Sequence, residues 1–97
     1  MAETFDYEAL PGGDLVRQGL ADLQRGVESV PALLVLAGGP RLRRVAIEVP
    51  VVQPSDDLPE HRLYQLLAEA HGDAAHSRYN ALMQRLVSFE RAAECVR

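Results

Sequence analysis

The chain of 97 residues contains no lysine and no tryptophan, and it has a single cysteine. One thiol excludes an internal disulfide, so we expect the protein to fold in a reducing compartment, the cytoplasm. The longest apolar run, residues 31–37, is far shorter than the ~20 residues that a membrane-spanning helix needs. The acidic N-terminus has no hydrophobic stretch typical of a signal peptide.

Positive charge is also scarce, because ten arginines face fourteen acidic residues and the formal net charge is −4. This balance argues against broad electrostatic binding to nucleic acid, which needs clustered positive charge. Without lysine the chain has no Gly-x-x-x-x-Gly-Lys loop for phosphates, and Gly-x-Gly-x-x-Gly is missing too. No cofactor and no catalytic residue are therefore predicted.

Hydrophobic residues are present in ordinary number, at 47% of the chain, which suffices for one core without disulfides or a structural metal. They recur at helical spacing: from Val16 to Val30 the intervals are 4, 3, 4 and 3, and from Ala75 to Val96 they are 4, 3, 4, 3, 4 and 3. We predict an N-terminal arm, residues 1–13, and one helical domain, residues 14–97.

Capping residues and helix breakers set the expected helix limits. Asp14 and Ser29 are typical N-caps, Pro59 suits a first turn, and Gly26 and Gly38 are expected to end helices. The predicted fold is a small all-α bundle of four or five helices. They cover residues 14–26, 30–37, a short 40–45, 59–71 and 74–96.

One segment does not follow the helical pattern. Val45, Ile47 and Val49 alternate with Ala46 and Glu48, which is the period of a strand. A short extended segment near 45–52 is one interpretation, although the sequence leaves strand and helix both open. A lone strand would need a partner strand or a second subunit to satisfy its backbone.

The last predicted helix is long for so small a chain. At 1.5 Å per residue it measures roughly 34 Å, whereas a domain of this size has a radius of gyration near ~13 Å. The helix is therefore either the central element of the bundle or partly an interface between subunits. We predict a homodimer that associates through residues 74–96.

Two groups of residues are candidates for binding a partner. Arg41, Arg43 and Arg44 form a cluster of guanidinium groups, which bind carboxylates and phosphates at two points. The other interpretation is a solvated face, or one that pairs with the acidic arm. Phe5 and Tyr7 lie on that arm without periodicity, so either the domain or another chain has to cover them.

Other polar residues have side chains that can bind metals or take part in catalysis. His61, His71 and His76 offer metal ligands near a helix corner, but a glycine interrupts the last two and no cysteine is close. Cys95 lies beside the chain end, where a catalytic thiol is not expected to be held. Glu90 and Glu94 are expected on the polar side of the last helix.

The sequence favours a non-enzymatic, cytoplasmic interaction or regulatory module that acts through protein–protein contacts, with itself as one possible partner. An antitoxin-like regulator linked to nucleic acid, using Arg41, Arg43 and Arg44 on phosphates, is the first alternative. A small metal-binding protein using His61, His71 and His76 is the second.

Overall fold

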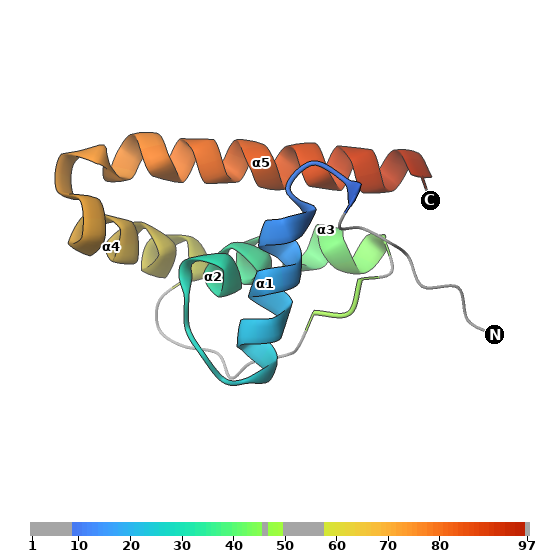
Figure 1. Cartoon of the computed structure of the whole chain (residues 1–97), viewed down its shortest axis with the longest axis horizontal. Helices are drawn as coiled ribbons and strands as arrows, with labels where there is room; N and C mark the ends of the chain where they lie inside the picture. Colours follow the sequence, from blue (N-terminus) through green and yellow to red (C-terminus); the bar gives the residue numbers. More distant parts are fainter. Residues whose placement is uncertain (1–8, 46, 50–57, 97) are drawn as a thin grey trace.

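A computed structural model describes residues 9–45, 47–49 and 58–96 of the chain. In these ranges the backbone is mainly α-helical, with a 3₁₀ turn, η2, joining the last two helices (Figure 1). The all-α class is confirmed, and the predicted helix limits agree with the structure within two residues. The elements are α1 (Gly13–Gln24), α2 (Val30–Ala37), α3 (Gly39–Arg44), α4 (Pro59–His71), η2 (Gly72–Ala74) and α5 (Ala75–Val96).

The start of α1 differs from the prediction. The N-cap is Gly12, with φ at 76°, and Asp14 lies in the first turn instead of capping the helix. Gly12 takes this place because a Cβ there would lie 2.7 Å from the carbonyl oxygen of Arg85 on α5. The Asp14 carboxylate accepts a hydrogen bond of 2.9 Å from the Arg85 guanidinium, which also ties α1 to α5.

The turn from α1 to α2 follows the predicted signals. Gly26 has φ at 72°. Its N–H donates to the backbone carbonyl of Leu23 at 3.1 Å, and the N–H of Val27 donates to the backbone carbonyl of Asp22 at 2.8 Å. These two bonds close the helix end as in a Schellman motif. Ser29 is confirmed as the N-cap of α2, because its Oγ accepts from the N–H of Ala32 at 3.2 Å.

The core consists of two hydrophobic clusters that α5 joins. α2, apolar on every side, is buried at its centre as the sequence predicts. Phe89 and Ala93 of α5 belong to the first cluster, with residues of α1, α2, α3 and the chain after α3. Ala75 and Leu86 of α5 belong to the second cluster, with residues of α2 and α4. The half-buried Leu36 packs against both.

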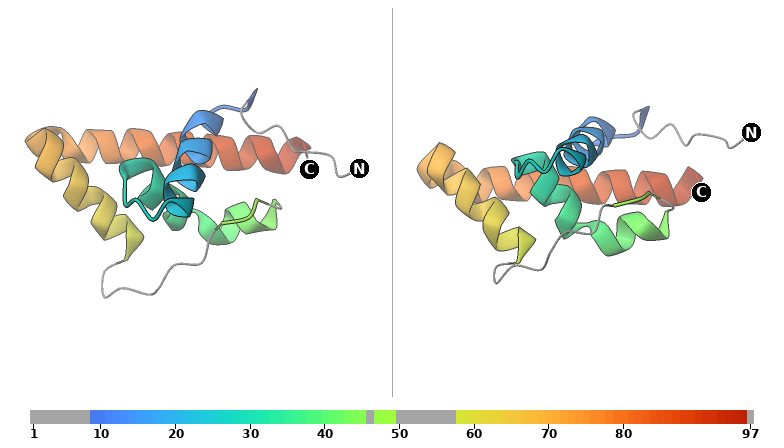
Figure 2. Two further views of the ribbon diagram at one scale, coloured as in Figure 1. Left: turned by 60° about the horizontal axis from the view of Figure 1, so that its bottom comes forward. Right: turned by 90° about the horizontal axis from the view of Figure 1, so that it is seen from below.

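α5 runs along the length of the molecule, and the other helices pack at different points beside it, with α1 running across its direction (Figures 1 and 2). Its predicted apolar stripe is covered by the same chain: Ala75, Leu86, Phe89 and Ala93 are buried, and Leu82 is half-buried. α5 is thus the central element of the bundle, one of the two alternatives that its length predicts, and the homodimer stays a prediction. No helix in the described ranges is both long enough and apolar enough to cross a membrane.

The segment after α3 alternates in burial but forms no strand in residues 45 and 47–49, the part that the structure describes. Val45, Ile47 and Val49 are buried in the first cluster, and Glu48 is exposed. The backbone finds partners other than a strand, since Ile47 N–H donates to the carbonyl of Leu42 at 3.1 Å. The other residues of the predicted segment, 46 and 50–52, lie outside the described ranges.

Candidate functional site at helix α3

The arginine cluster lies on α3, a helix of six residues with Pro40 in its first turn. Leu42 is completely buried in the first hydrophobic cluster and anchors the helix. The arginines around it point in different directions: Arg41 is half-buried, whereas Arg43 and Arg44 are exposed. The structure therefore divides the predicted binding group into one half-buried residue and two exposed residues, of which Arg43 also contacts the backbone of Val49.

Arg41 is engaged within the chain. Its Nη2 lies 2.5 Å from Oε1 of Glu94 on α5, and its Nε donates to the same oxygen at 2.6 Å. Its Nη1 lies 3.5 Å from Oε1 of Glu90. The sequence did not predict this ion pair between α3 and α5. It joins two residues that are 53 positions apart in the chain.

Arg43 and Arg44 remain accessible to a partner. Arg43 is exposed, and its Nη2 donates to the backbone carbonyl of Val49 at 3.3 Å, which orients the side chain. Arg44 is the last residue of α3 and is also exposed. The other two predicted contact residues, Phe5 and Tyr7, lie outside the described ranges.

Glu90 contradicts the expectation for the last helix, because only 4% of the residue is exposed. Gly38 makes room for it: a Cβ at that position would lie 3.0 Å from Oε2 of Glu90. Burial raises the pKa of Glu90, against the lowering effect of Arg41, and the negative charge of Glu94 adds to the rise. The sequence contains a signal for this burial, since Leu86, Glu90 and Ala93 have the spacing of an apolar stripe on one helix face.

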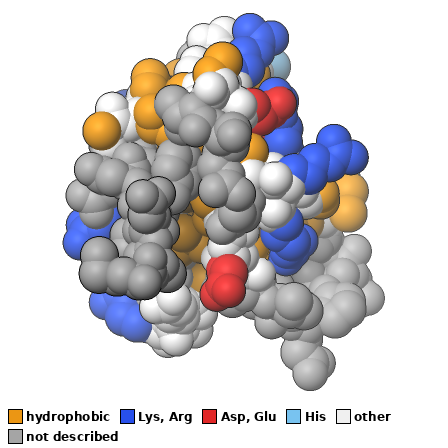
Figure 3. All heavy atoms as spheres, turned by 90° about the vertical axis from the view of Figure 1, so that its right-hand side faces the viewer, with side chains coloured by type: hydrophobic (Ala, Val, Ile, Leu, Met, Phe, Trp, Pro, Cys, Tyr) orange, Lys and Arg blue, Asp and Glu red, His pale blue; other side chains and the backbone are white. Residues whose placement is uncertain are grey.

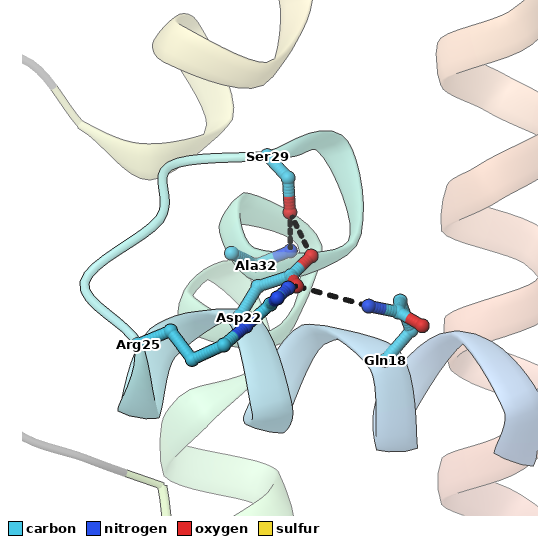
Figure 4. A network of polar contacts seen from close by, with 5 residues as sticks. All are labelled: Gln18, Asp22, Arg25, Ser29 and Ala32. Carbon is cyan, nitrogen blue, oxygen red and sulfur yellow. Dashed lines mark hydrogen bonds and ion pairs between the residues drawn. The ribbon is translucent and has the colours of Figure 1, made fainter.

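A second polar cluster, which the sequence analysis did not find, surrounds Asp22 of α1 (Figure 4). The buried Asp22 carboxylate accepts from Nε2 of Gln18 at 2.9 Å, from Oγ of Ser29 at 2.6 Å, and from the Arg25 guanidinium. The hydrogen bonds from Ser29 and Arg25 lower the pKa of Asp22. Since every donor belongs to α1 or to the turn after it, the cluster fixes that turn.

The three histidines do not form a site. His61, His71 and His76 are all exposed, and His76 has Nε2 at 3.2 Å from Nδ2 of Asn80. Among the residues that the structure describes, no group of three or more His, Cys, Asp or Glu side chains is placed to hold a metal ion. Cys95 is exposed near the end of α5.

The distribution of charge on the α3 side of the molecule is mixed. Figure 3 views the end where α5 finishes, and among the described residues it shows both arginine and acidic side chains on this face. Glu48, which follows α3 in the sequence, and Glu94, which pairs with Arg41, are both exposed acidic residues. The visible part of this face is therefore not a continuous basic surface.

Comparison of the chain with protein-family models, curated proteins and solved structures finds no match. The geometry of the described residues is accordingly the basis for a functional proposal.

Proposed function

We propose that this protein is a non-enzymatic, cytoplasmic interaction module that binds an acidic segment of a protein partner through Arg43 and Arg44. The observation that carries the proposal is their exposure on a helix that is held in place. Leu42 anchors α3 in the core, and Arg41 pairs with Glu94 on α5. Guanidinium groups bind carboxylates at two points, and on a helix that is already fixed this binding requires no further ordering of the backbone.

The two buried carboxylates favour a binding role over a catalytic one. Asp22 and Glu90 are the carboxylates in the described residues whose pKa values are clearly shifted. Each is surrounded by groups of its own chain: Asp22 by the turn after α1, and Glu90 by Arg41, Gly38 and α5. Their shifted pKa values thus have structural causes, as ion pairs inside folds often do.

Charge favours a protein partner over nucleic acid. The net charge of −4 repels a phosphate polymer at long range, and the exposed Glu48 and Glu94 lie near the α3 arginines. A short acidic peptide needs only a few local guanidinium groups, and Arg43 and Arg44 are both exposed on α3. Nucleic-acid binding is retained as an outcome of the test.

The test replaces Arg43 and Arg44 by alanine together and compares the proteins bound by this variant and by the unchanged chain in native lysate. The matched control replaces Arg78 and Arg91, two exposed arginines of α5, so that the loss of charge is equal. We expect specific partners to be lost only with the α3 variant, while circular dichroism stays unchanged in both.

Two results would contradict the proposal. If both variants retain every specific partner, the α3 arginines do not bind it. If instead the unchanged chain shifts a labelled duplex in a gel, and the shift weakens steeply with salt, phosphate contacts are the better explanation. A separate variant with Phe5 and Tyr7 replaced by serine tests the arm.

A further inference from the structure

The contact between α3 and α5 contains a buried carboxyl group. Glu90 is 4% exposed and lies against Gly38, which precedes α3, and against Leu86 on its own helix. An ionised carboxylate in such surroundings costs free energy unless a positive charge and hydrogen bonds compensate it. The way in which Glu90 is compensated therefore affects how firmly α3 is held.

That compensation is incomplete, because two carboxylates share one guanidinium group. Arg41 lies 3.5 Å from Glu90 but 2.5 Å from Glu94, so the closer pair is with Glu94. Among the described residues, the charged groups that act on Glu90 are Arg41 from α3 and Glu94 from α5; Gly38 and Leu86 bring no charge. With both carboxylates ionised, the cluster carries one excess negative charge at the α3–α5 contact.

We propose that Glu90 makes the docking of α3 proton-sensitive, so that α3 is held more firmly on α5 when Glu90 is protonated than when it is ionised. Protonation removes the buried charge and its repulsion with Glu94, and it leaves the closer Arg41–Glu94 pair intact. The raised pKa of Glu90 is consistent with this direction, since folding then favours the protonated carboxyl.

A change in the docking of α3 would also affect the exposed arginines of α3 and the buried segment that follows it. α3 carries Arg43 and Arg44, and the next described residues include Ile47 and Val49, both buried against the first cluster. Loosening α3 would release this apolar segment together with the exposed arginines. The inference does not depend on the proposed binding function, because it concerns the chain without a partner.

Amide hydrogen exchange measures the docking directly. The N–H group of Leu42 donates to the carbonyl of Gly38 at 2.9 Å. The N–H groups of Val45 and Ile47 both donate to the carbonyl of Leu42, each at 3.1 Å. After correction for intrinsic exchange, we expect their protection relative to the α4 amides to rise as the pH is lowered from about 7.5 toward about 4.5, because the raised pKa of Glu90 makes the docked state take up its proton first. Amides of α4, such as Leu67, report on the rest of the fold.

The variant Glu90→Gln keeps the shape of the side chain and removes its charge. We expect its α3 protection to be independent of pH and, at about pH 7.5, no lower than that of the unchanged protein. Glu94→Gln is the comparison: it removes the pair with Arg41 and should lower α3 protection, but because Glu90 can still titrate, some dependence on pH should remain.

Several outcomes would overturn the proposal. It is wrong if Glu90→Gln and the unchanged protein have the same pH dependence at α3, if α4 amides change equally, or if Glu90→Gln lowers α3 protection. The carboxyl carbon resonance of Glu90 gives a second measurement on the unmodified chain. We expect it to titrate above the ordinary value of 4.5, and a midpoint at or below that value also rejects the proposal.

Discussion

Gly19 on α1 lies directly against the backbone carbonyl of Pro31 at the start of α2. A Cβ on Gly19 would be 2.3 Å from that oxygen and 2.5 Å from Cγ2 of Val35. The two helices approach so closely that no side chain fits between them at this point. Because the obstacle on one side is backbone, it cannot be relieved by a rotamer change alone.

We therefore expect Gly19→Ala to destabilise the protein by about 3 kcal/mol, the upper part of the usual range for overpacking. The gain of about 1 kcal/mol in helix propensity opposes this loss but is smaller. Urea unfolding followed by circular dichroism measures the difference. Gly26→Ala is the comparison, because Gly26 has positive φ but nothing within 4 Å, and should cost only about 1 kcal/mol. An equal or smaller loss at Gly19 would contradict the close approach.

The two hydrophobic clusters are expected to unfold together. Phe89 is completely buried in the first and Leu67 is 3% exposed in the second. Replacement by alanine should cost about 3–5 kcal/mol at Phe89 and about 2–5 kcal/mol at Leu67, whereas Ser88→Ala, on the exposed side of α5, should change stability by less than about 0.5 kcal/mol.

Since α5 contributes to both clusters and Leu36 contacts both, each variant should show one thermal transition at a lower temperature. Calorimetry distinguishes this from the alternative. Two separate transitions in either variant would mean that α5 does not join the clusters into one cooperative unit.

Helix limits were predictable because their signals are local. The Ser29 cap, the Gly26 stop and Pro59 in a first turn act within one or two turns of the helix. The exception, Asp14, is explained by a distant contact. Gly12 is required where the chain touches the carbonyl of Arg85, and no local rule contains that information.

The candidate site was only partly predictable for the same reason. The sequence identifies the arginines but not that Arg41 turns to Glu94 while Arg43 and Arg44 remain exposed. Glu90 was misplaced because a charged residue was assumed to face solvent, although its spacing matched the apolar stripe. Pairing between α3 and α5 depends on tertiary packing, which periodicity along one helix does not determine.

The buried stripe of α5 leads to a prediction about oligomeric state. Leu86, Phe89 and Ala93 are buried in the two clusters with residues of the other helices and of the chain after α3, so these three side chains have no apolar surface left for a second subunit. We expect light scattering to give a mass close to the 10.7 kDa of one chain. A mass of two chains would restore the predicted homodimer, which would then have to use another face of α5.

Acid is expected to weaken the turn after α1 through Asp22. Hydrogen bonds from Ser29 and Arg25 hold the pKa of Asp22 below its ordinary value of 3.8, so the unfolded chain takes up the proton first. The stabilisation by ionised Asp22 is therefore complete above 3.8 and is lost as the pH falls through the lower pKa of the folded state. Glu90 has the opposite sign, because its raised pKa makes the folded chain take up its proton first.

Asp22→Asn separates the two effects, since asparagine cannot titrate and has only one acceptor oxygen. We expect this variant to be less stable than the unchanged protein at about pH 5, and the difference to shrink steadily toward about pH 2.5 as Asp22 is protonated. Ser29→Ala, which removes the cap of α2 and one donor to Asp22, should cost about 1 kcal/mol near neutral pH. Urea unfolding at a series of pH values gives both comparisons. A stability difference between Asp22→Asn and the unchanged protein that stays constant over this interval would show that the ionised Asp22 does not stabilise the turn.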